Sequence, residues 1–441
     1  MPVHLGWQIH TNAIIDMVFS PDDRLLATAS GDQSARVVDM STQTTLAILE
    51  NHSASLKQVR FQPGSGSSSV LATSSRDGTV QIWDLRCKGS DGPKQRWSAA
   101  EPTPHATRAG RPPEYCRAVY NIYDAHRPVD RNALNPLVGR VDTAGRGDVS
   151  ERNGDVSVTA ISFLPEGNEH LLLTASELDT SVMLWDLRSL HSKNRRPQVA
   201  ISKTRQPESH SQWRHFAINS MNLSSDGSRL YALSKDNTVY AYSTSHLILG
   251  HAPELSLDNR RRRLPPQETK EGLGPIYGFR HPMLHATSFY VKSALREAKN
   301  GQSEMLAVGS SDGCAILFPT DERYFPKHED RDQHDPASVP MFSERPGRRG
   351  TGSGLRTSSR AKGSIAISMN GTPLIRGHDR EVGSLAWTAE GKLVTVGDDF
   401  IIRCWQEGED ARRLRTGGEG EGRRGGCGWA DVSETYDEEN D

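Results

Sequence analysis

The sequence predicts an all-β fold built from repeated small sheets, and three observations support this prediction. The 441-residue chain is poor in hydrophobic residues, at 35%, and rich in turn formers, with 39 glycines and 24 prolines. An aspartate followed six positions later by an aromatic residue recurs along the chain. Each such aspartate follows an apolar run that ends in small or hydroxyl residues. This combination is typical of short strands joined by tight turns, and it does not indicate long helices.

The recurring aspartates place the repeats. Five of them precede an aromatic residue: Asp77 and Trp83, Asp179 and Trp185, Asp236 and Tyr242, Asp312 and Phe318, and Asp399 and Trp405. In a further copy, Asp32 precedes the aliphatic Val38. Another strand-like segment lies upstream of each aspartate, as in "LKQVRFQP" and "VTAISFLP". The sequence therefore contains six copies of strand, turn, strand, turn and strand.

Six copies of this unit predict a WD40 β-propeller, in which each blade is a small twisted sheet. One blade cannot bury both of its faces until its neighbours stack on it. Alternating apolar residues along the strands give each blade a face for this contact. We expect the turn aspartates, Trp405 and three histidines, His10, His52 and His378, to join hydrogen-bonded networks within the blades. We interpret these histidines as structural residues and not as metal ligands.

Long insertions interrupt the repeats. Asp32 and Asp77 are 45 residues apart, which is the length of an uninterrupted WD repeat, whereas later intervals are longer. Because the inserted segments mix Pro, Gly, Ser and Arg, they bury too little apolar surface to offset the entropy of ordering. We therefore expect one propeller domain at residues 1–407 and a disordered Gly-, Arg- and acid-rich tail at 408–441. The expected disordered insertions lie at about residues 87–155, 246–286 and 320–376.

Composition and motifs argue against several classes of function. The formal net charge is −2, so no overall field attracts the chain to nucleic acid or to an anionic membrane. The segment "MPVHLGWQIH" lacks the charged and apolar regions of a secretion signal, and no apolar stretch is long enough to span a bilayer, so we expect neither export nor a membrane span. The five cysteines stand far apart, which favours a reducing compartment. No phosphate-binding loop, metalloprotease motif or nucleophile elbow is present, so we expect no catalysis, no cofactor and no bound metal.

Two local patterns keep more than one interpretation. His281 and His285 have the spacing of a helical metal pair, but a proline between them and the lack of a third ligand favour a solvated loop. Arg260–Arg263 is the densest charge run. It can be a solvated loop, a nuclear import signal or a contact with nucleic acid or an acidic partner. Direct binding of nucleic acid therefore stays open.

The motif Trp-Asp-Leu-Arg occurs twice, at residues 83–86 and 185–188. In each copy the arginine, Arg86 or Arg188, follows the last strand of the repeated unit. We expect both side chains to project from one rim of the propeller, where a planar guanidinium with five donors can engage a partner. The alternative is an ordinary surface salt bridge to a nearby aspartate. Repetition at one place in the unit favours docking.

Several segments resemble the denticleless family, in the same order along the chain. They include "NAIID", "SGDQSA", "RDGTVQIWDLRC" and "SFYVKSAL", and the resemblance to a divergent, fungal-like member extends over about residues 7–407. Members of this family are WD-repeat substrate receptors of cullin-four RING ubiquitin ligases. The resemblance implies that six residues face the damaged-DNA-binding adaptor of the ligase: Trp83, Asp84, Arg86, Trp185, Asp186 and Arg188.

The resemblance also implies a function in the nucleus. Family members bring the ligase to replication and cell-cycle proteins whose degrons are displayed on the chromatin-bound sliding clamp. These targets are degraded during replication and after DNA damage. The receptor forms no bond itself and only holds the target lysine near a ubiquitin-charged enzyme. The alternative is a WD scaffold outside the ligase, such as a chromatin or histone chaperone module, in which the two arginines are incidental.

Two features depart from the family. Its propeller is expected to have seven blades, with one before the segment matching "WQIHTNAIID", whereas six repeats are visible here. We expect a missing first blade and not a six-bladed ring closed by "GWQI", because an incomplete ring leaves a blade face unpaired. The segment after Trp405 is short beside the long extension of animal relatives. For the degron, we expect the mouth opposite the docking rim, with acidic loops such as Asp22–Asp23 or Asp398–Asp399 suiting a basic segment.

Overall fold

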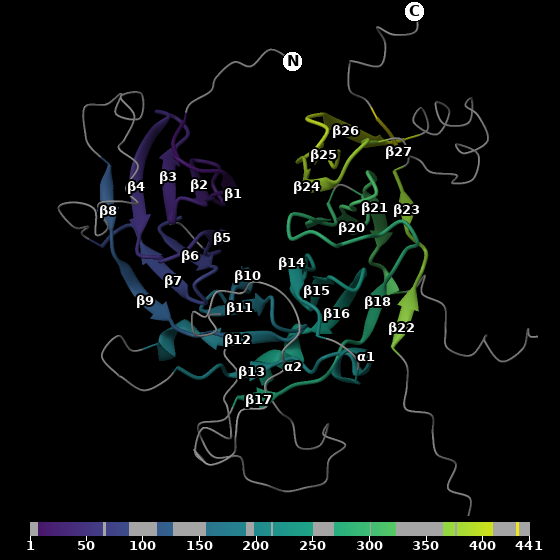
Figure 1. Cartoon of the computed structure of the whole chain (residues 1–441), viewed down its shortest axis with the longest axis horizontal. Coiled ribbons are helices and arrows are strands. Elements are labelled where there is room, and N and C mark those ends of the chain that lie inside the picture. Colours follow the sequence, from purple (N-terminus) through teal and green to yellow (C-terminus); the bar gives the residue numbers. More distant parts are fainter. Residues whose placement is uncertain are drawn as a thin grey trace, which may run out of the picture.

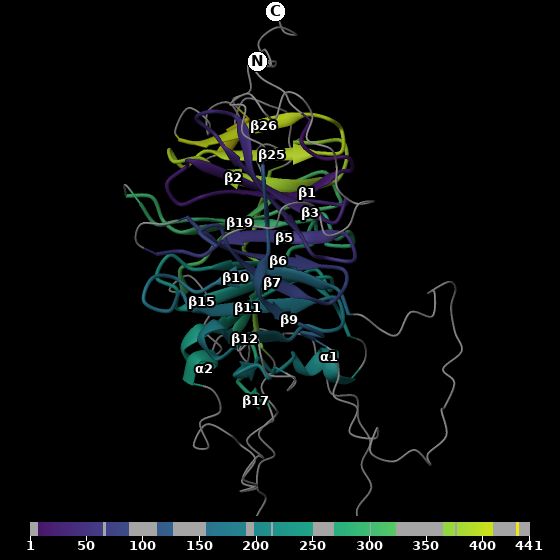
Figure 2. The ribbon, with the colours of Figure 1, turned by 90° about the vertical axis from the view of Figure 1, so that its left-hand side faces the viewer.

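In the computed structural model, the described residues are 8–64, 68–87, 113–126, 156–190, 198–212, 215–249, 269–299, 301–322, 365–374, 377–408 and 429–431. They form six sheets arranged around a ring, which is the WD40 β-propeller fold (Figure 1). Seen from the side, the strands run between the two flat faces of the ring (Figure 2). The predicted fold class is therefore confirmed.

We number the blades 1 to 6 in chain order. Blade 1 contains β1 (Ile14–Phe19), β2 (Leu25–Ser30), β3 (Ser34–Asp39) and β4 (Thr44–Glu50). Blade 2 contains β5 (Leu56–Phe61), β6 (Val70–Ser75), β7 (Val80–Asp84) and β9 (Ala118–Ile122). Blade 3 contains β10 (Val158–Phe163), β11 (Leu171–Ser176), β12 (Val182–Asp186) and β13 (Ser202–Lys203).

The remaining blades repeat this order. Blade 4 contains β14 (Ile218–Leu223), β15 (Arg229–Ser234), β16 (Thr238–Ser243) and β18 (Tyr277–Phe279). Blade 5 contains β19 (Ser293–Arg296), β20 (Met305–Val308), β21 (Ile316–Pro319) and β23 (Thr372–Pro373). Blade 6 contains β24 (Val382–Trp387), β25 (Leu393–Gly397), β26 (Ile402–Glu407) and β27 (Trp429–Asp431). Successive strands of each blade pair antiparallel, so the first and third strands of a blade end at the same face of the ring.

Three short strands add a fifth member to blades 1, 3 and 4. β8 (Glu114–Cys116) pairs in parallel with β4, β17 (Lys270–Glu271) with β13, and β22 (Ala366–Ser368) with β18. In each case the chain then enters the outer strand of the next blade, which is β9, β18 or β23. The added strand supplies backbone partners to an outer edge that would otherwise be open.

These strands lie inside the segments that the sequence predicts to be disordered. The structure differs there because an edge strand offers hydrogen bonds to any passing backbone, and composition alone does not record such pairing. Trp429–Asp431 likewise forms β27 within the predicted tail at 408–441 and occupies the outer position of blade 6. That position is the one which "GWQI" would take in a ring closed by the N-terminus.

Five buried apolar clusters fill the five interfaces between successive blades. The cluster between blades 1 and 2 includes Val37, Leu49 and Trp83, and the next, between blades 2 and 3, includes Ile82 and Trp185. The other three clusters join blades 3 and 4, 4 and 5, and 5 and 6 in the same way. The aromatic residue six positions after each of five turn aspartates thus fills the space between two sheets, whereas Val38 of blade 1 belongs to none of these clusters.

Blades 6 and 1 do not share such an interface among the described residues. Neighbouring innermost strands contact one another from β1 to β24, but no contact of that extent joins β24 back to β1. Met17 on β1 is 62% exposed and Ile402 on β26 is 65% exposed. In Figure 1 the ring is open between these two blades. The expectation of a further blade stays a prediction.

The described helices are short: α1 (Glu208–Gln212), α2 (Thr244–Leu249) and a single 3₁₀ turn, η2 (Leu187–Ser189). None of the helices in the described ranges is long and apolar enough to cross a membrane.

Candidate partner-docking site

Arg86 lies just beyond the end of β7, in a turn that its own aspartate organises. The carboxylate of Asp84 accepts hydrogen bonds from the Arg86 backbone N–H at 2.9 Å, from Nε at 2.9 Å and from Nη2 at 2.8 Å. The guanidinium and the carboxylate are therefore joined by two parallel bonds, which fix the plane of the fork. These bonds hold the pKa of Asp84 below its usual value.

Arg188 repeats this arrangement at the end of β12. Asp186 accepts from the Arg188 backbone N–H at 2.9 Å, from Nε at 3.1 Å and from Nη2 at 3.2 Å. Partial burial raises the pKa of Asp186, but the bonds from Arg188 outweigh it and the net shift is downward. The local turn is η2, which the Asp186 side chain caps.

The two arginines occupy equivalent positions on neighbouring blades. Asp84 pairs with Val70 in blade 2, and Asp186 pairs with Leu171 in blade 3, in each case the last residue of the third strand with the first of the second. Side-chain exposure is 64% for Arg86 and 67% for Arg188. Both guanidinium groups therefore reach solvent at one rim. Each also forms a surface salt bridge with its aspartate, which is the alternative to docking that the sequence left open.

The two tryptophans of the motif lie in the interior. Trp83 is 0% exposed and Trp185 is 3% exposed, and each donates from Nε1 to a threonine hydroxyl of its own blade, Thr73 at 2.8 Å or Thr174 at 2.9 Å. Of the six residues predicted to face a partner, the tryptophans hold the strand in place, and only the aspartates and arginines reach the surface.

The paired aspartate and arginine are confined to blades 2 and 3 in the described chain. Blade 1 has the aspartate, Asp39, but Ser41 stands where the arginine would be. Asp39 accepts hydrogen bonds from the backbone N–H and the hydroxyl of Ser41. The third strands of blades 4, 5 and 6 end at Ser243, Pro319 and Glu407. The rim is therefore asymmetric, with two forks side by side and none in the other blades.

The predicted histidine networks lie in the interior of the blades. In blade 2, His52 contacts Asp77 through Nδ1 at 3.1 Å and Thr73 through Nε2 at 2.8 Å. Because the Asp77 carboxylate can only accept, the Nδ1 proton of His52 faces it, and the Thr73 hydroxyl, which accepts from Trp83, lies against Nε2. The result is a closed chain of four buried polar groups.

Blades 6 and 1 contain close copies of this network. His378 contacts Asp399 at 3.0 Å and Thr395 at 2.8 Å, and Trp405 donates to Thr395 at 3.0 Å. In blade 1, His10 contacts Asp32 at 2.9 Å and Thr28 at 2.8 Å, while the aliphatic Val38 replaces the tryptophan. These contacts account for every polar atom of the three imidazoles.

Two further histidines take part that the sequence pattern did not reveal. His126 contacts Thr174 of blade 3 at 2.9 Å, and burial lowers its pKa to about 4. His210 of α1 contacts Asp236 of blade 4 at 2.8 Å, and Tyr240 donates to the same carboxylate. A long insertion separates His126 in sequence from blade 3, which it contacts. His210 lies in the helix α1 before blade 4, where the sequence shows no repeat pattern that marks a histidine.

The remaining turn aspartates have other partners. Asp179 accepts from Ser181 and from Gln206 instead of from a histidine. Asp312 lies 2.7 Å from Nδ1 of His285 in an exposed pair. His281 accepts from the backbone N–H of Met283 at 3.1 Å. Across the described ranges, no group of three or more His, Cys, Asp or Glu residues could hold a metal ion. Arg260–Arg263 lies outside the described residues.

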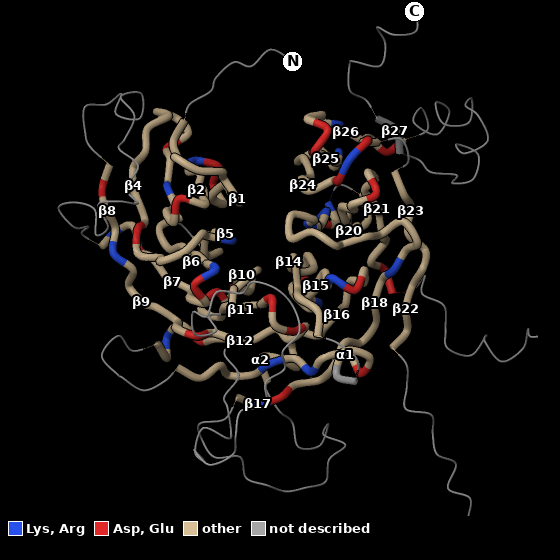
Figure 3. The backbone as a smooth tube through the Cα atoms, viewed as in Figure 1, with Lys and Arg blue, Asp and Glu red and all other residues tan. Residues whose placement is uncertain are grey.

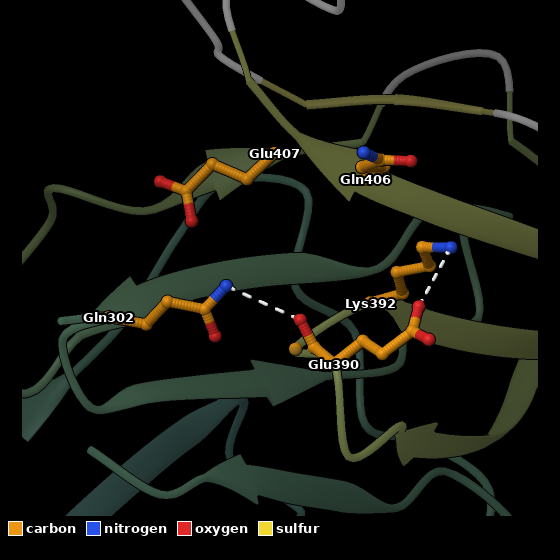
Figure 4. A pocket seen from close by; sticks show the side chains of 6 residues that line it. Gln302, Glu390, Lys392, Gln406 and Glu407 are labelled. Carbon is orange, nitrogen blue, oxygen red and sulfur yellow. Dashed lines mark hydrogen bonds and ion pairs between the residues drawn. The ribbon is translucent and has the colours of Figure 1, made fainter. Parts of the chain in front are cut away.

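A polar hollow lies between blades 5 and 6 (Figure 4). Gln302 donates to the backbone carbonyl of Glu390 at 3.4 Å, and Lys392 pairs with the Glu390 carboxylate at 3.0 Å. Gln406 and Glu407 complete the visible lining. The lining contains no Ser, Thr, Cys or His side chain.

Comparison with known proteins agrees with the WD-repeat fold. The family model of the WD domain, G-beta repeat, matches residues 4–39, 43–84 and 371–406. Cell division cycle protein cdt2 of Schizosaccharomyces pombe is 27% identical over 406 residues, which is 91% of this chain and 59% of that protein. The Denticleless protein homologs of Gallus gallus and Homo sapiens are 24% and 23% identical over 91% of this chain.

The chain spans 59% of the fission yeast relative and only 41% and 40% of the chicken and human ones. The similarity therefore covers the propeller and not the whole length of those proteins. It agrees with the resemblance seen in the sequence motifs. The chain is a divergent relative of the Cdt2 and Denticleless proteins and is consistent with membership of the denticleless family.

Proposed function

We propose that the chain is the substrate-recognition subunit of a cullin-four RING ubiquitin ligase. In this function it docks to the damaged-DNA-binding adaptor and brings degron-bearing replication and cell-cycle proteins to the ligase for degradation, in the nucleus. The chain performs no bond chemistry. Its task is to raise the local concentration of a target lysine near the enzyme that carries ubiquitin.

One observation carries the docking part of this proposal. Arg86 and Arg188 present two exposed guanidinium forks at the same corner of adjacent blades, with the same orientation set by Asp84 and Asp186. A solitary surface ion pair has no reason to recur at one register position. Two forks side by side can engage carboxylates or carbonyl oxygens of a flat partner surface, and their preset orientation reduces the entropy lost on binding.

The proposal is tested by co-purification from cells. We expect the double variant Arg86→Ala with Arg188→Ala to lose the adaptor, because each substitution removes one fork. Since both side chains are exposed, its melting temperature should stay within about 3 °C of the wild type. A matched control replaces two exposed arginines at the opposite face of the ring, Arg205 and Arg380, with alanine and should keep the adaptor.

The outcome separates the two classes of function. If the double variant is folded and recovers as much adaptor as the control, the arginines are incidental and a scaffold outside the ligase is the better account. Identifying the proteins that co-purify with the wild type in replicating cells then tests the targets independently, by whether replication proteins are among them.

A further inference from the structure

A second group of basic residues lies at the face of the ring opposite the arginine rim. Lys57 is the second residue of β5, Arg76 follows the end of β6, and Lys235 follows the end of β15. Lys292 directly precedes β19. In each blade the first strand begins at this face and the second strand ends at it. These residues therefore lie at the face of blades 2, 4 and 5 that is opposite Arg86.

The positions of these residues are equivalent from blade to blade. The backbone N–H of Arg76 donates to Ser55 and that of Lys235 donates to Ala217, each time the residue just before the first strand. Glu177 has the same bond in blade 3. Figure 3 shows basic residues beside β5 and β15. At this face, blades 2 to 5 thus carry the four basic residues and one acidic residue, Glu177.

Phe289 stands among these cations. The Lys57 ammonium lies 4.2 Å from the centre of its ring and the Lys292 ammonium 3.5 Å from it. Lys292 also donates to the backbone carbonyl of Asn219 at 3.0 Å. The ring belongs to the connection between β18 and β19, so one aromatic side chain holds together lysines from blades 2 and 5.

The cations have no carboxylate partner at ion-pair distance in the described part of the chain. By contrast, other basic residues of the same blades are paired, as Arg60 is with Asp16 and Arg229 with Glu322. Burial lowers the pKa of Lys57, and Arg76 and Lys235 lower it further against the opposing effect of Glu177. The cluster therefore has an excess of positive charge, which Glu177 and Asp16 offset only in part.

We propose that Lys57, Arg76, Lys235 and Lys292 form a docking surface for an acidic segment of a partner protein. Carboxylates of such a segment would neutralise the mutual repulsion of the cations and gain charge-assisted hydrogen bonds from them. That this partner is a ligase target rests on the proposed function, whereas the binding itself does not. The sequence led us to expect acidic loops here, at Asp22–Asp23 or Asp398–Asp399. Asp22 lies instead in the turn after β1, at the arginine rim, whereas Asp398 follows the end of β25 and lies at this face in blade 6.

Nucleic acid fits this surface less well. A single-stranded nucleic acid would need an open aromatic face for base stacking and a row of cations along its backbone. The ring of Phe289 already has two ammonium groups over it, and the four cations are grouped around that one ring.

The surface is tested with the full chain and fluorescent peptides, without any ligase subunit. The probes are a peptide rich in Asp and Glu, its amide version with Asn and Gln, and a lysine version. We expect only the acidic peptide to bind, with an affinity that falls as salt is raised from about 0.05 to 0.5 M. The triple variant Lys57→Gln, Arg76→Gln and Lys235→Gln should lose at least about tenfold in affinity.

The matched control changes the same net charge elsewhere. Arg24→Gln, Lys270→Gln and Lys299→Gln remove three exposed cations outside the cluster and should leave binding within about twofold. Melting temperatures of both variants verify the fold. Equal affinity for the acidic and amide peptides, or equal losses in the two triple variants, would overturn the proposal. So would an oligonucleotide that binds more tightly than the acidic peptide with the same dependence on the four cations.

This test fails independently of the proposed function. Loss of the adaptor on substitution of Arg86 and Arg188, together with no binding of the acidic peptide, would leave the ligase account standing and remove this surface. The reverse result would keep the surface and remove the ligase account.

Discussion

Arg86 and Arg188 occupy the same corner of adjacent blades, and each guanidinium is held by the aspartate two residues before it. The distances differ by at most 0.4 Å between the two copies, from 2.8 to 3.2 Å for the Nη2 bond. Such a repeat of a side-chain geometry requires the strand end, the turn and the register to be the same in both blades. It follows that a partner meeting one fork also finds the other in a fixed relation to it.

The aspartates should matter for docking more than for stability. We expect Asp84→Asn with Asp186→Asn to lower adaptor affinity by about tenfold, because an amide cannot accept both bonds and the forks lose their preset plane. The melting temperature should hardly change, since both pairs are exposed. Asp39→Asn in blade 1, where no arginine follows, is the control, and titration of the purified adaptor is the measurement. Unchanged affinity in the double variant would show that orientation is irrelevant.

The hydroxyl of Thr73 should be worth more than an ordinary buried hydroxyl. Thr73→Val leaves both the Trp83 N–H and the His52 ring without their partner, which should lower the free energy of unfolding by about 1–3 kcal/mol. Thr45 is also buried, but its hydroxyl has no hydrogen-bond partner among the described residues, so Thr45→Val should change stability by less than about 0.5 kcal/mol. Urea denaturation compares the two, and equal losses would contradict the network.

The carboxylate of Asp32 should make stability depend on acid pH. Burial alone would raise its pKa, but the hydrogen bond and charge of His10 lower it from 3.8 to about 2. Because the folded value lies below the unfolded one, the ionised group stabilises the fold above about pH 4. This stabilisation is lost as the pH falls from about 4 to 2, and it is on the order of 2 kcal/mol.

The variant Asp32→Asn isolates this contribution. It should be less stable than the wild type at pH 6, with the difference shrinking as the pH approaches 2. Denaturation curves at a series of pH values give the difference directly. A difference that stays constant with pH would mean that the carboxylate is not the titrating group.

The charge of Lys292 should destabilise the fold, and it should make stability depend on pH in the alkaline range. Burial lowers its pKa from 10.5 to about 7, with Arg60, Lys57 and Lys235 adding to the shift and Asp16 opposing it. Below pH 7 the ammonium group is charged in both the folded and the unfolded state, so the folded state bears the full destabilisation that comes from burying this charge. Between about pH 7 and 10 the unfolded state holds a proton that the folded state has released, and stability rises with pH by at most about 1.4 kcal/mol per unit.

Replacing this lysine removes the dependence. Lys292→Met should gain more stability relative to the wild type at pH 6 than at pH 9, because the charged form is the costly one. Thermal melts at the two values suffice as the measurement. An equal effect at both would place the Lys292 pKa outside this window.

The inner strands and the turn chemistry of the blades were predictable from sequence, because they depend on local spacing. The segment from His52 to Trp83 carries the complete network of blade 2. The corresponding histidine of blade 3 was not predictable, since His126 lies 48 residues before Thr174 with an insertion between them. Once a repeat is interrupted, its period no longer indicates which histidine belongs to which blade.

Other features depend on pairing that no single segment encodes. The strand Glu114–Cys116 forms only because the outer edge of β4 is available beside it. Similarly, Lys57 and Lys292 are 235 positions apart in the sequence and converge only when blades 2 and 5 face each other across the ring. The local geometry of Arg86 was predictable in outline, but the bond to Asp84 that sets its plane follows from the turn at the end of β7.

The most direct test of the account is a titration of purified adaptor against the purified chain and against the Arg86→Ala, Arg188→Ala variant. The account predicts tight binding by the wild type and a loss of at least about a hundredfold in the variant, with an unchanged melting temperature. Equal affinity of the two folded proteins would contradict it.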